Sequence, residues 1–283
     1  MNMPLGQLLV HVDASSRCAV RLELARSLAR TLGTSLGALY AATPSIDALP
    51  AALQAEARLA VALHGIDEDR RIRARATFDH VMDTPGPAVT WAVLGHHPVS
   101  RGFAHQALCA DLMVLGQPDP SEQERAEVPP DFVESVMMAS GKPAIILPWA
   151  GVPGDLLGTI VIAWKQTPQA ARAVCGALPL LQRARRVHVV AWEDASHDGV
   201  ISEGTSLSLH SYLLSHAIEA TWHRPGTEPE RLLGELLLST AFDLDASLLV
   251  MDCYGHSRAR EWVLGGVSRT ILQSMTMPVL MAH

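Results

Sequence analysis

The feature that most constrains the fold is an internal repeat, because the chain of 283 residues carries the same order of elements twice. A short apolar run, a polar turn and an alanine-rich segment follow one another from Leu8 and again from Thr159. In the first alanine-rich segment Leu24, Leu28 and Leu32 recur every fourth residue, which places them on one face of a helix. A repeat of about half the chain indicates a duplicated domain, since solenoid repeats are much shorter.

The ends of the two halves correspond as well. The sequence ADLMVLG at 110–116 parallels DASLLVMD at 245–252, and KPAIILPWA at 142–150 parallels MPVLMAH at 277–283. These runs are almost continuously apolar, as expected for strands of a parallel sheet that helices cover on both faces. Right-handed crossovers between such strands give a doubly wound sheet. The sequence therefore predicts an α/β fold with two tandem doubly wound domains, each with a mainly parallel five-stranded sheet.

A stretch with three glycines and a proline, 150–158, marks the expected linker between the domains. We expect one domain over residues 1–150 and a second over residues 158–283, related by a pseudo-twofold axis. Pairing of the last strands, 144–148 with 278–282, would make an intrachain pseudo-dimer and protect two sheet edges. A homodimer of the whole chain is a further expectation that the sequence leaves open.

Composition excludes several classes of function. Hydrophobic residues make up 48% of the chain and charged residues 18%, and the net charge of −7 argues against binding to nucleic acid or to an anionic membrane. The apolar stretch 144–164 is interrupted by Pro148, Pro153 and Asp155, so no transmembrane helix is expected. No basic segment precedes the first apolar run, so no signal peptide is expected. The four cysteines lack CxxC spacing, which favours reduced thiols in the cytoplasm.

The richest chemical signal is the sequence LLVMDCYGHSRAREWVLGGVS at 248–268. A buried-type strand leads into Gly255, and nine residues later the pair Gly265–Gly266 opens a new helical segment. Glycines after a strand let backbone N–H groups approach an anion closely, and the following helix start favours negative charge. Ligands of open α/β sheets usually bind in the crevice at the carboxyl ends of the strands. The stretch therefore predicts a phosphate or nucleotide site.

Together with GQPDP, TIVIAWKQTPQAARAV and the terminal MPVLMAH, this stretch resembles the universal stress protein family, in a form with two such domains in one chain. The resemblance covers nearly the whole length. It implies an adenine nucleotide alpha hydrolase-like fold and a site for ATP with Mg²⁺. In members that bind ATP, an acid ending the first strand contacts the nucleoside and the glycine loop wraps the phosphates. The resemblance further implies a cytoplasmic stress-response module with an unidentified protein partner, rather than a metabolic enzyme.

The first half keeps only part of that pattern. Asp13 stands at the position of the family's acid, and Gly116 at that of the first loop glycine. The residues that follow, 117–120, include two prolines, which have no N–H to donate, and Asp119, which would repel phosphate. We therefore expect no triphosphate in this half. Asp13 has an alternative interpretation as a turn or cap residue, and the acidic stretch 117–130 is expected to be an exposed loop.

The second half keeps most of the loop but departs at its edges. Asp252 stands in place of the first glycine and Lys165 in place of the first-strand acid. Two interpretations stay open: the two residues border a remodelled nucleotide site, or they form an ion pair that fills the crevice. The candidate cofactor-binding residues are Gly255, His256, Ser257, Arg258, Gly265, Gly266, Val267 and Ser268, with Lys165, Asp252 and Asp13.

Two other functions stay open as alternatives. The first is a slow ATPase in which Asp252 is the local carboxylate available to a metal. The second is a protein-interaction scaffold without a ligand. The sequence assigns no catalytic residue and no metal site, because it contains no G-x-S-x-G elbow, Walker A lysine or HExxH motif.

Overall fold

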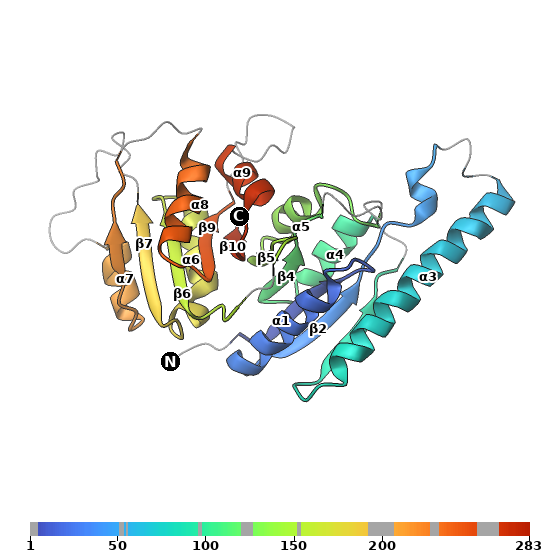
Figure 1. The fold of residues 1–283 in the computed structure, drawn as a ribbon, viewed down its shortest axis with the longest axis horizontal. Helices are drawn as coiled ribbons and strands as arrows, with labels where there is room; N and C mark the ends of the chain where they lie inside the picture. The colour runs from blue at the N-terminus through green and yellow to red at the C-terminus, as the bar shows by residue number, and fades with distance from the viewer. Residues whose placement is uncertain are drawn as a thin grey trace. The chain divides into compact units, whose positions relative to one another are not determined.

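The computed structural model divides the chain into two compact units, Met1–Val152 and Pro153–His283 (Figure 1). Each unit is an α/β fold in which parallel strands alternate with helices, and this confirms the predicted fold class. The structure describes residues 5–50, 54, 56–95, 98–119, 127–151, 154–191, 207–226, 232–253 and 266–283.

The first unit has strand order β3-β2-β1-β4-β5, and each neighbouring pair is parallel. Helix α1 packs against α3, and α4 packs against α5. The strands are β1 (Gln7–Val12), β2 (Ser35–Tyr40), β3 (Val89–Val93), β4 (Leu112–Gly116) and β5 (Ala144–Leu147). The helices are α1 (Cys18–Leu32), the 3₁₀ turn η1 (Ser45–Ala48), α3 (Ala57–Met82), α4 (Val99–Ala107) and α5 (Phe132–Ser140).

The second unit repeats this topology, with strand order β8-β7-β6-β9-β10 and parallel pairing throughout. Helix α8 packs against α9, and α6 packs against β9 and β10. The strands are β6 (Thr159–Trp164), β7 (Arg186–Ala191), β8 (Thr221–His223), β9 (Leu248–Asp252) and β10 (Val279–Ala282). The helices are α6 (Pro168–Leu181), α7 (Leu209–Ser215), α8 (Leu233–Asp243) and α9 (Gly266–Ser274).

Local sequence explains where the first helix of each unit begins or ends. Helix α1 ends at Gly33, whose φ of 69° is left-handed and whose N–H donates to the carbonyl oxygen of Ala29. Helix α6 begins after Thr167, whose side chain accepts a hydrogen bond from the N–H of Ala170, and Pro168 fills the first helical position. The cap at Gly33 fixes the turn from α1 into β2, and the cap at Thr167 fixes the turn from β6 into α6.

The strand order places the candidate sites. In each unit the first strand lies between the second and the fourth strand. The chain therefore adds its second and third strands on one side of the first strand, and its fourth and fifth strands on the other side. A crevice forms at the carboxyl ends of strands at such a switch point. Residues after β1 and β4 therefore meet in the first unit, and residues after β6 and β9 meet in the second. Among the described helices, none is long and apolar enough to cross a membrane.

Candidate functional site

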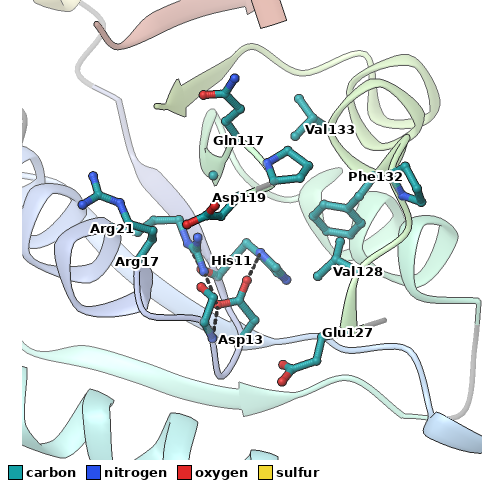
Figure 2. A pocket seen from close by; sticks show the side chains of 14 residues that line it. His11, Asp13, Arg17, Arg21, Gln117, Asp119, Glu127, Val128, Phe132 and Val133 are labelled. Carbon is teal, nitrogen blue, oxygen red and sulfur yellow. Dashed lines mark hydrogen bonds and ion pairs between the residues drawn. The ribbon is translucent and has the colours of Figure 1, made fainter. Parts of the chain in front are cut away.

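The first unit has a cavity of about 270 Å³ at the carboxyl ends of β1 and β4 (Figure 2). Charged and apolar side chains line different sides of it. Figure 2 shows Asp13, Arg17 and Arg21 on one side and Val128, Phe132 and Val133 on the other. A cavity of this size lies just below the usual range for sites of drug-sized ligands, so it has room for a small ligand.

An ion pair between Asp13 and Arg21 dominates the charged side. The Nη2 group of Arg21 donates to Oδ1 of Asp13 over 2.7 Å, and its Nε group donates to the carbonyl oxygen of His11 over 2.6 Å. The N–H and the hydroxyl of Ser15 also donate to Oδ1 of Asp13. Burial alone would raise the pKa of Asp13, but the Arg21 charge and these hydrogen bonds lower it to about 2.

His11 is the second ionisable group buried in this cavity, with 2% of its surface exposed. Its Nε2 group donates to the carbonyl oxygen of Ala41 over 2.8 Å, which fixes the neutral tautomer because a carbonyl can only accept. The imidazole also contacts the rings of Phe103 and Phe132. Burial lowers the pKa of His11 to about 4, so the ring is neutral at pH 7.

Arg21 also covers the position of the first loop glycine. A methyl group added at Gly116 would clash with Nη1 of Arg21, so the guanidinium lies directly against this glycine. The sequence prediction did not include Arg21. A signal existed, because Arg21 lies three residues after Cys18 and four before Ala25, on the buried stripe of α1. The hydrogen bonds from Ser15 match the turn interpretation of Asp13, and the ion pair with Arg21 is a contact that the sequence did not predict.

The stretch 117–130, predicted to be an exposed loop, has two buried polar residues at its described ends: Gln117 is 8% exposed and Glu127 is 4% exposed. Pro118 and Pro130 are exposed, and residues 120–126 lie outside the described part of the chain. The side-chain oxygen of Gln117 accepts from the N–H of Trp149 over 3.0 Å, and Glu127 accepts from the N–H of Ala14 over 2.9 Å. The polar side chains are buried because they satisfy backbone donors that parallel strands leave at their ends.

In the second unit the corresponding edge holds Thr167 and Asp252. The hydroxyl of Thr167 donates to Oδ2 of Asp252 over 3.2 Å while its oxygen accepts from the N–H of Ala170 over 3.1 Å. Burial raises the pKa of Asp252, and the Thr167 hydrogen bond and the charge of Lys165 only partly oppose this. The side chain of Lys165 is exposed, and no ion pair among the described residues joins it to Asp252. The structure therefore shows no direct ion pair between these two side chains, and their place at the border of a nucleotide site stays a prediction.

The structure brings together some of the other predicted residues. Gly266, Val267 and Ser268 form the first turn of α9, as the sequence predicted, and Ser268 is 2% exposed. Asp13 belongs to the separate cavity of the first unit. Five predicted residues lie outside the described part of the chain: Gly255, His256, Ser257, Arg258 and Gly265. Within the described ranges, no group of three or more His, Cys, Asp or Glu side chains could hold a metal ion.

Comparison with known proteins agrees with this layout. Residues 157–283 match the sequence model of the universal stress protein family. The match confirms the resemblance seen in the glycine-rich stretch. Comparison with curated protein sequences gave no match.

Solved structures extend the likeness to the whole chain. A universal stress protein from Archaeoglobus fulgidus DSM 4304 shares 14% identity and a TM-score of 0.68, over 98% of this chain and 95% of that chain. A putative universal stress protein from Pseudomonas aeruginosa UCBPP-PA14 shares 12% identity and a TM-score of 0.57, over 98% and 93%. A functionally unknown protein from Pseudomonas aeruginosa PAO1 shares 12% identity and a TM-score of 0.57, over 98% of this chain and 92% of that chain. These likenesses show the fold of both units.

Proposed function

We propose that the protein is a cytoplasmic stress-response module whose second unit binds an adenine nucleotide, and whose first unit binds no triphosphate. One observation carries the proposal: Thr167 and Asp252 meet at the carboxyl ends of β6 and β9, with Lys165 near enough for its charge to act on Asp252. This edge lies within the segment that matches the universal stress protein family. The same segment contains the glycine-rich sequence that precedes α9.

The chemistry of the described side chains fits a phosphate group in part. Lys165 supplies an exposed positive charge, and the N-terminus of α9 adds the positive end of a helix dipole. Asp252 opposes a bound anion, but its raised pKa and the hydrogen bond from Thr167 reduce that opposition. The Mg²⁺ that accompanies ATP would offset the remaining carboxylate charge.

The first unit does not fit a triphosphate. The guanidinium of Arg21 lies against Gly116 and is held by Asp13, so the place where phosphate-facing amides would be needed is filled. Asp119 and Glu127 add further carboxylates to the lining of the cavity. We therefore expect a single nucleotide per chain.

Calorimetric titration of the full chain with ATP and Mg²⁺ tests the proposal. Gly266→Val should weaken binding at least about tenfold by blocking the close approach of phosphate. The fold has space for the new side chain, because a methyl group built at Gly266 meets no heavy atom of the described residues within 4 Å. Gly65→Val is the matched control, since Gly65 of α3 is equally open and lies in the other unit. Absence of heat at millimolar ATP would contradict the proposal.

Asp252→Asn separates binding from hydrolysis. Removal of the carboxylate charge should strengthen ATP binding about three- to tenfold if Asp252 only opposes the phosphates. If the protein is instead a slow ATPase that uses Asp252 to hold a metal, phosphate release should fall in the same variant. Phosphate release that is unchanged by Asp252→Asn rejects the ATPase alternative.

A ligand-free scaffold is favoured by one observation, the filled crevice of the first unit. In that case a protein partner would bind equally with and without ATP. Titration of Gly266→Val and of the unaltered chain against such a partner would give the same affinity.

A further inference from the structure

Two histidines meet on neighbouring strands of the second unit. His188 lies within β7, and His223 is the last residue of β8, the edge strand of this sheet. The Nδ1 atom of His188 lies 2.9 Å from the Nε2 atom of His223. By contrast, Lys165 follows β6 and Asp252 ends β9. The histidine pair therefore belongs to other strands than the proposed nucleotide site.

The register of the two strands explains why the rings meet. His188 lies opposite Thr221, and Val190 lies opposite His223. Residues that lie opposite each other, or two apart on one strand, point to the same face of a sheet. Both imidazoles therefore stand on one face as diagonal neighbours, a separation that ring side chains can bridge. Trp222 points to the other face, because side chains alternate along β8.

The first unit has the same strand register but lacks the two rings. Gly37 occupies the position of His188, and Ala92 occupies that of His223. The same sheet thus forms without either imidazole. The topology does not require the histidine pair, so a function of its own is the better explanation.

The separation of the two nitrogens fits joint coordination of a metal ion. Imidazole nitrogens bind transition metals at about 2.0–2.1 Å. Two nitrogens at this distance from one ion lie about 2.9 Å apart if they subtend a right angle, and about 3.3 Å apart at the tetrahedral angle. The 2.9 Å between His188 and His223 matches the right angle. Right angles are typical of square-planar and tetragonal sites, which hold Cu²⁺ or Ni²⁺.

A metal ion would replace the proton between the two rings. One of the two nitrogens donates a hydrogen bond and the other accepts it. When a metal binds, the donor ring moves this proton to its other nitrogen, so two neutral imidazoles become ligands without net release of a proton. The ring centroids lie 5.1 Å apart, so the rings meet nearly end to end. Each ring therefore has to turn only slightly to aim its nitrogen at the ion.

The charges around His188 narrow the class of ion. Burial lowers the pKa of His188, and the imidazole of His223 and the charge of Arg186 lower it further. The ring is neutral at pH 7, which is the form that binds metals. Arg186 repels cations, although a carboxylate oxygen of Asp245 lies 4.0 Å from its guanidinium. This repulsion disfavours Mg²⁺ and Ca²⁺, which bind oxygen ligands, and leaves ions that form strong bonds to nitrogen.

We propose that His188 and His223 together bind one divalent transition-metal ion, Cu²⁺ or Ni²⁺. Water completes the coordination, because within the described ranges no group of three His, Cys, Asp or Glu side chains is available. The ion links β8 to β7 and so fastens the edge strand of the second unit. The proposal does not depend on nucleotide binding.

Calorimetric titration of the full chain with Cu²⁺ and with Ni²⁺, in a buffer that does not bind metals, tests the proposal. We expect saturable binding that is tighter for Cu²⁺ than for Ni²⁺, and no saturable heat with Mg²⁺. Electron paramagnetic resonance with one equivalent of Cu²⁺ should show coupling to two imidazole nitrogens, and to fewer when either histidine is replaced.

Two variants locate the site. His188→Gln and His223→Gln each keep a polar side chain but remove an imidazole ligand, and each should weaken Cu²⁺ binding at least about tenfold. The double variant should bind no more weakly than either single variant, because one imidazole alone no longer chelates the ion. His105→Gln, on an exposed position of α4 in the first unit, is the matched control and should leave the affinity unchanged. Circular dichroism confirms that each variant is folded.

Hydrogen exchange provides a readout of where the ion acts. Ni²⁺ should slow exchange of the β8 amide hydrogens at least about threefold in the unaltered chain, because the ion ties the edge strand to β7. In His188→Gln the same concentration of Ni²⁺ should leave these exchange rates unchanged.

Three results would overturn the proposal. The first is no saturable heat with Cu²⁺ up to about 1 mM. The second is equal Cu²⁺ affinity in His188→Gln, His223→Gln and the unaltered chain, or an equal loss in His105→Gln. The third is exchange of the β8 amides in the unaltered chain that is the same with and without Ni²⁺.

Discussion

Asp13 and Asp252 lie at the crevice ends of two sheets with the same topology, yet their carboxyl groups titrate in opposite directions. The pKa of Asp13 falls to about 2 because Arg21 is in direct contact with it. The pKa of Asp252 rises because burial is opposed only by a hydroxyl group and by the more distant charge of Lys165. A single nearby arginine therefore decides whether a buried carboxylate closes the crevice or remains available to it.

The comparison also shows how two units of the same topology differ. In the first unit Asp13 and Arg21 form a buried ion pair on one side of the cavity, since both residues are less than 10% exposed. In the second unit the carboxyl group is half-buried and its partner is a helix cap. The first crevice thus contributes to stability, while the second retains groups that a ligand could contact.

The largest expected effect comes from breaking the ion pair of the first unit. Arg21→Met leaves Asp13 buried without its cation and should lower the free energy of unfolding by about 3–5 kcal/mol. Urea unfolding at pH 7 measures this change. Arg185→Met is the matched control, because the Arg185–Asp155 pair of the second unit is mostly exposed and should contribute less than about 1 kcal/mol. Equal losses in the two variants would contradict the special role of Arg21.

The next effect is a dependence of stability on pH that belongs to His11. Its pKa is about 4 in the folded protein and 6.5 as a free side chain, so the unfolded chain binds more protons between these values. Stability should therefore fall by about 3 kcal/mol as pH drops from 6.5 to 4. Asp13 affects stability only at lower pH, because its stabilising contribution is lost as pH falls from 3.8 toward 2.

Substitution of His11 by glutamine tests that assignment. The amide of His11→Gln can still donate to the carbonyl oxygen of Ala41 but cannot take up a proton. Urea unfolding midpoints of the variant should depend much less on pH between 6.5 and 4 than those of the unaltered chain, and the remaining slope comes from groups such as His188, whose pKa is also lowered by burial. A slope equal to that of the unaltered chain would assign the pH dependence to other groups.

A smaller loss of stability should distinguish substitution of Gly116 from substitution of Gly266. Gly116→Ala places a methyl group against the guanidinium of Arg21 and should destabilise the protein by about 1–3 kcal/mol. Gly266→Ala meets no atom within 4 Å and should change stability by less than about 0.5 kcal/mol. Thermal unfolding of the two variants measures the difference. If Gly266→Ala proves the more damaging of the two, the comparison of the crevices is wrong.

The smallest expected effect concerns the helix cap of the second unit. Thr167→Val removes the acceptor for the N–H of Ala170 and the donor to Asp252, and it should cost about 1 kcal/mol. Thr167→Ser keeps the hydroxyl and should cost less. Urea unfolding followed over the second unit's transition provides the measurement, and an identical loss in both variants would exclude the hydroxyl as the cause.

Local patterns predicted the fold well because strands, caps and glycines act over short distances. Continuous apolar runs indicated the parallel strands, and Thr167–Pro168 marked the start of α6. The candidate site was harder, because its groups come from separate elements. Arg21 lies eight residues after Asp13, and Glu127 lies 113 residues after Ala14, so neither contact follows from a motif.

One of the two interpretations of Lys165 and Asp252, a direct ion pair, is not what the structure shows, and the reason is physical. Complementary charges at neighbouring strand ends suggested an ion pair, but the exposed ammonium group gains little from such a contact in water. Asp252 instead takes its hydrogen bond from Thr167, which is already fixed in place as the cap of α6. A preformed donor requires less ordering than a long flexible side chain.

The length of α3 has a consequence for motion. Its buried side chains, Ala74, Phe78 and Val81, all belong to its second half, whereas Val61 and Ile66 near its start are 74% and 46% exposed. Amide hydrogens in the last turns should therefore exchange with solvent only when the unit unfolds, and those in the first turns should exchange by local opening. The helix would behave as an arm anchored at one end, and a protease could cut its first turns while the sheet stays intact.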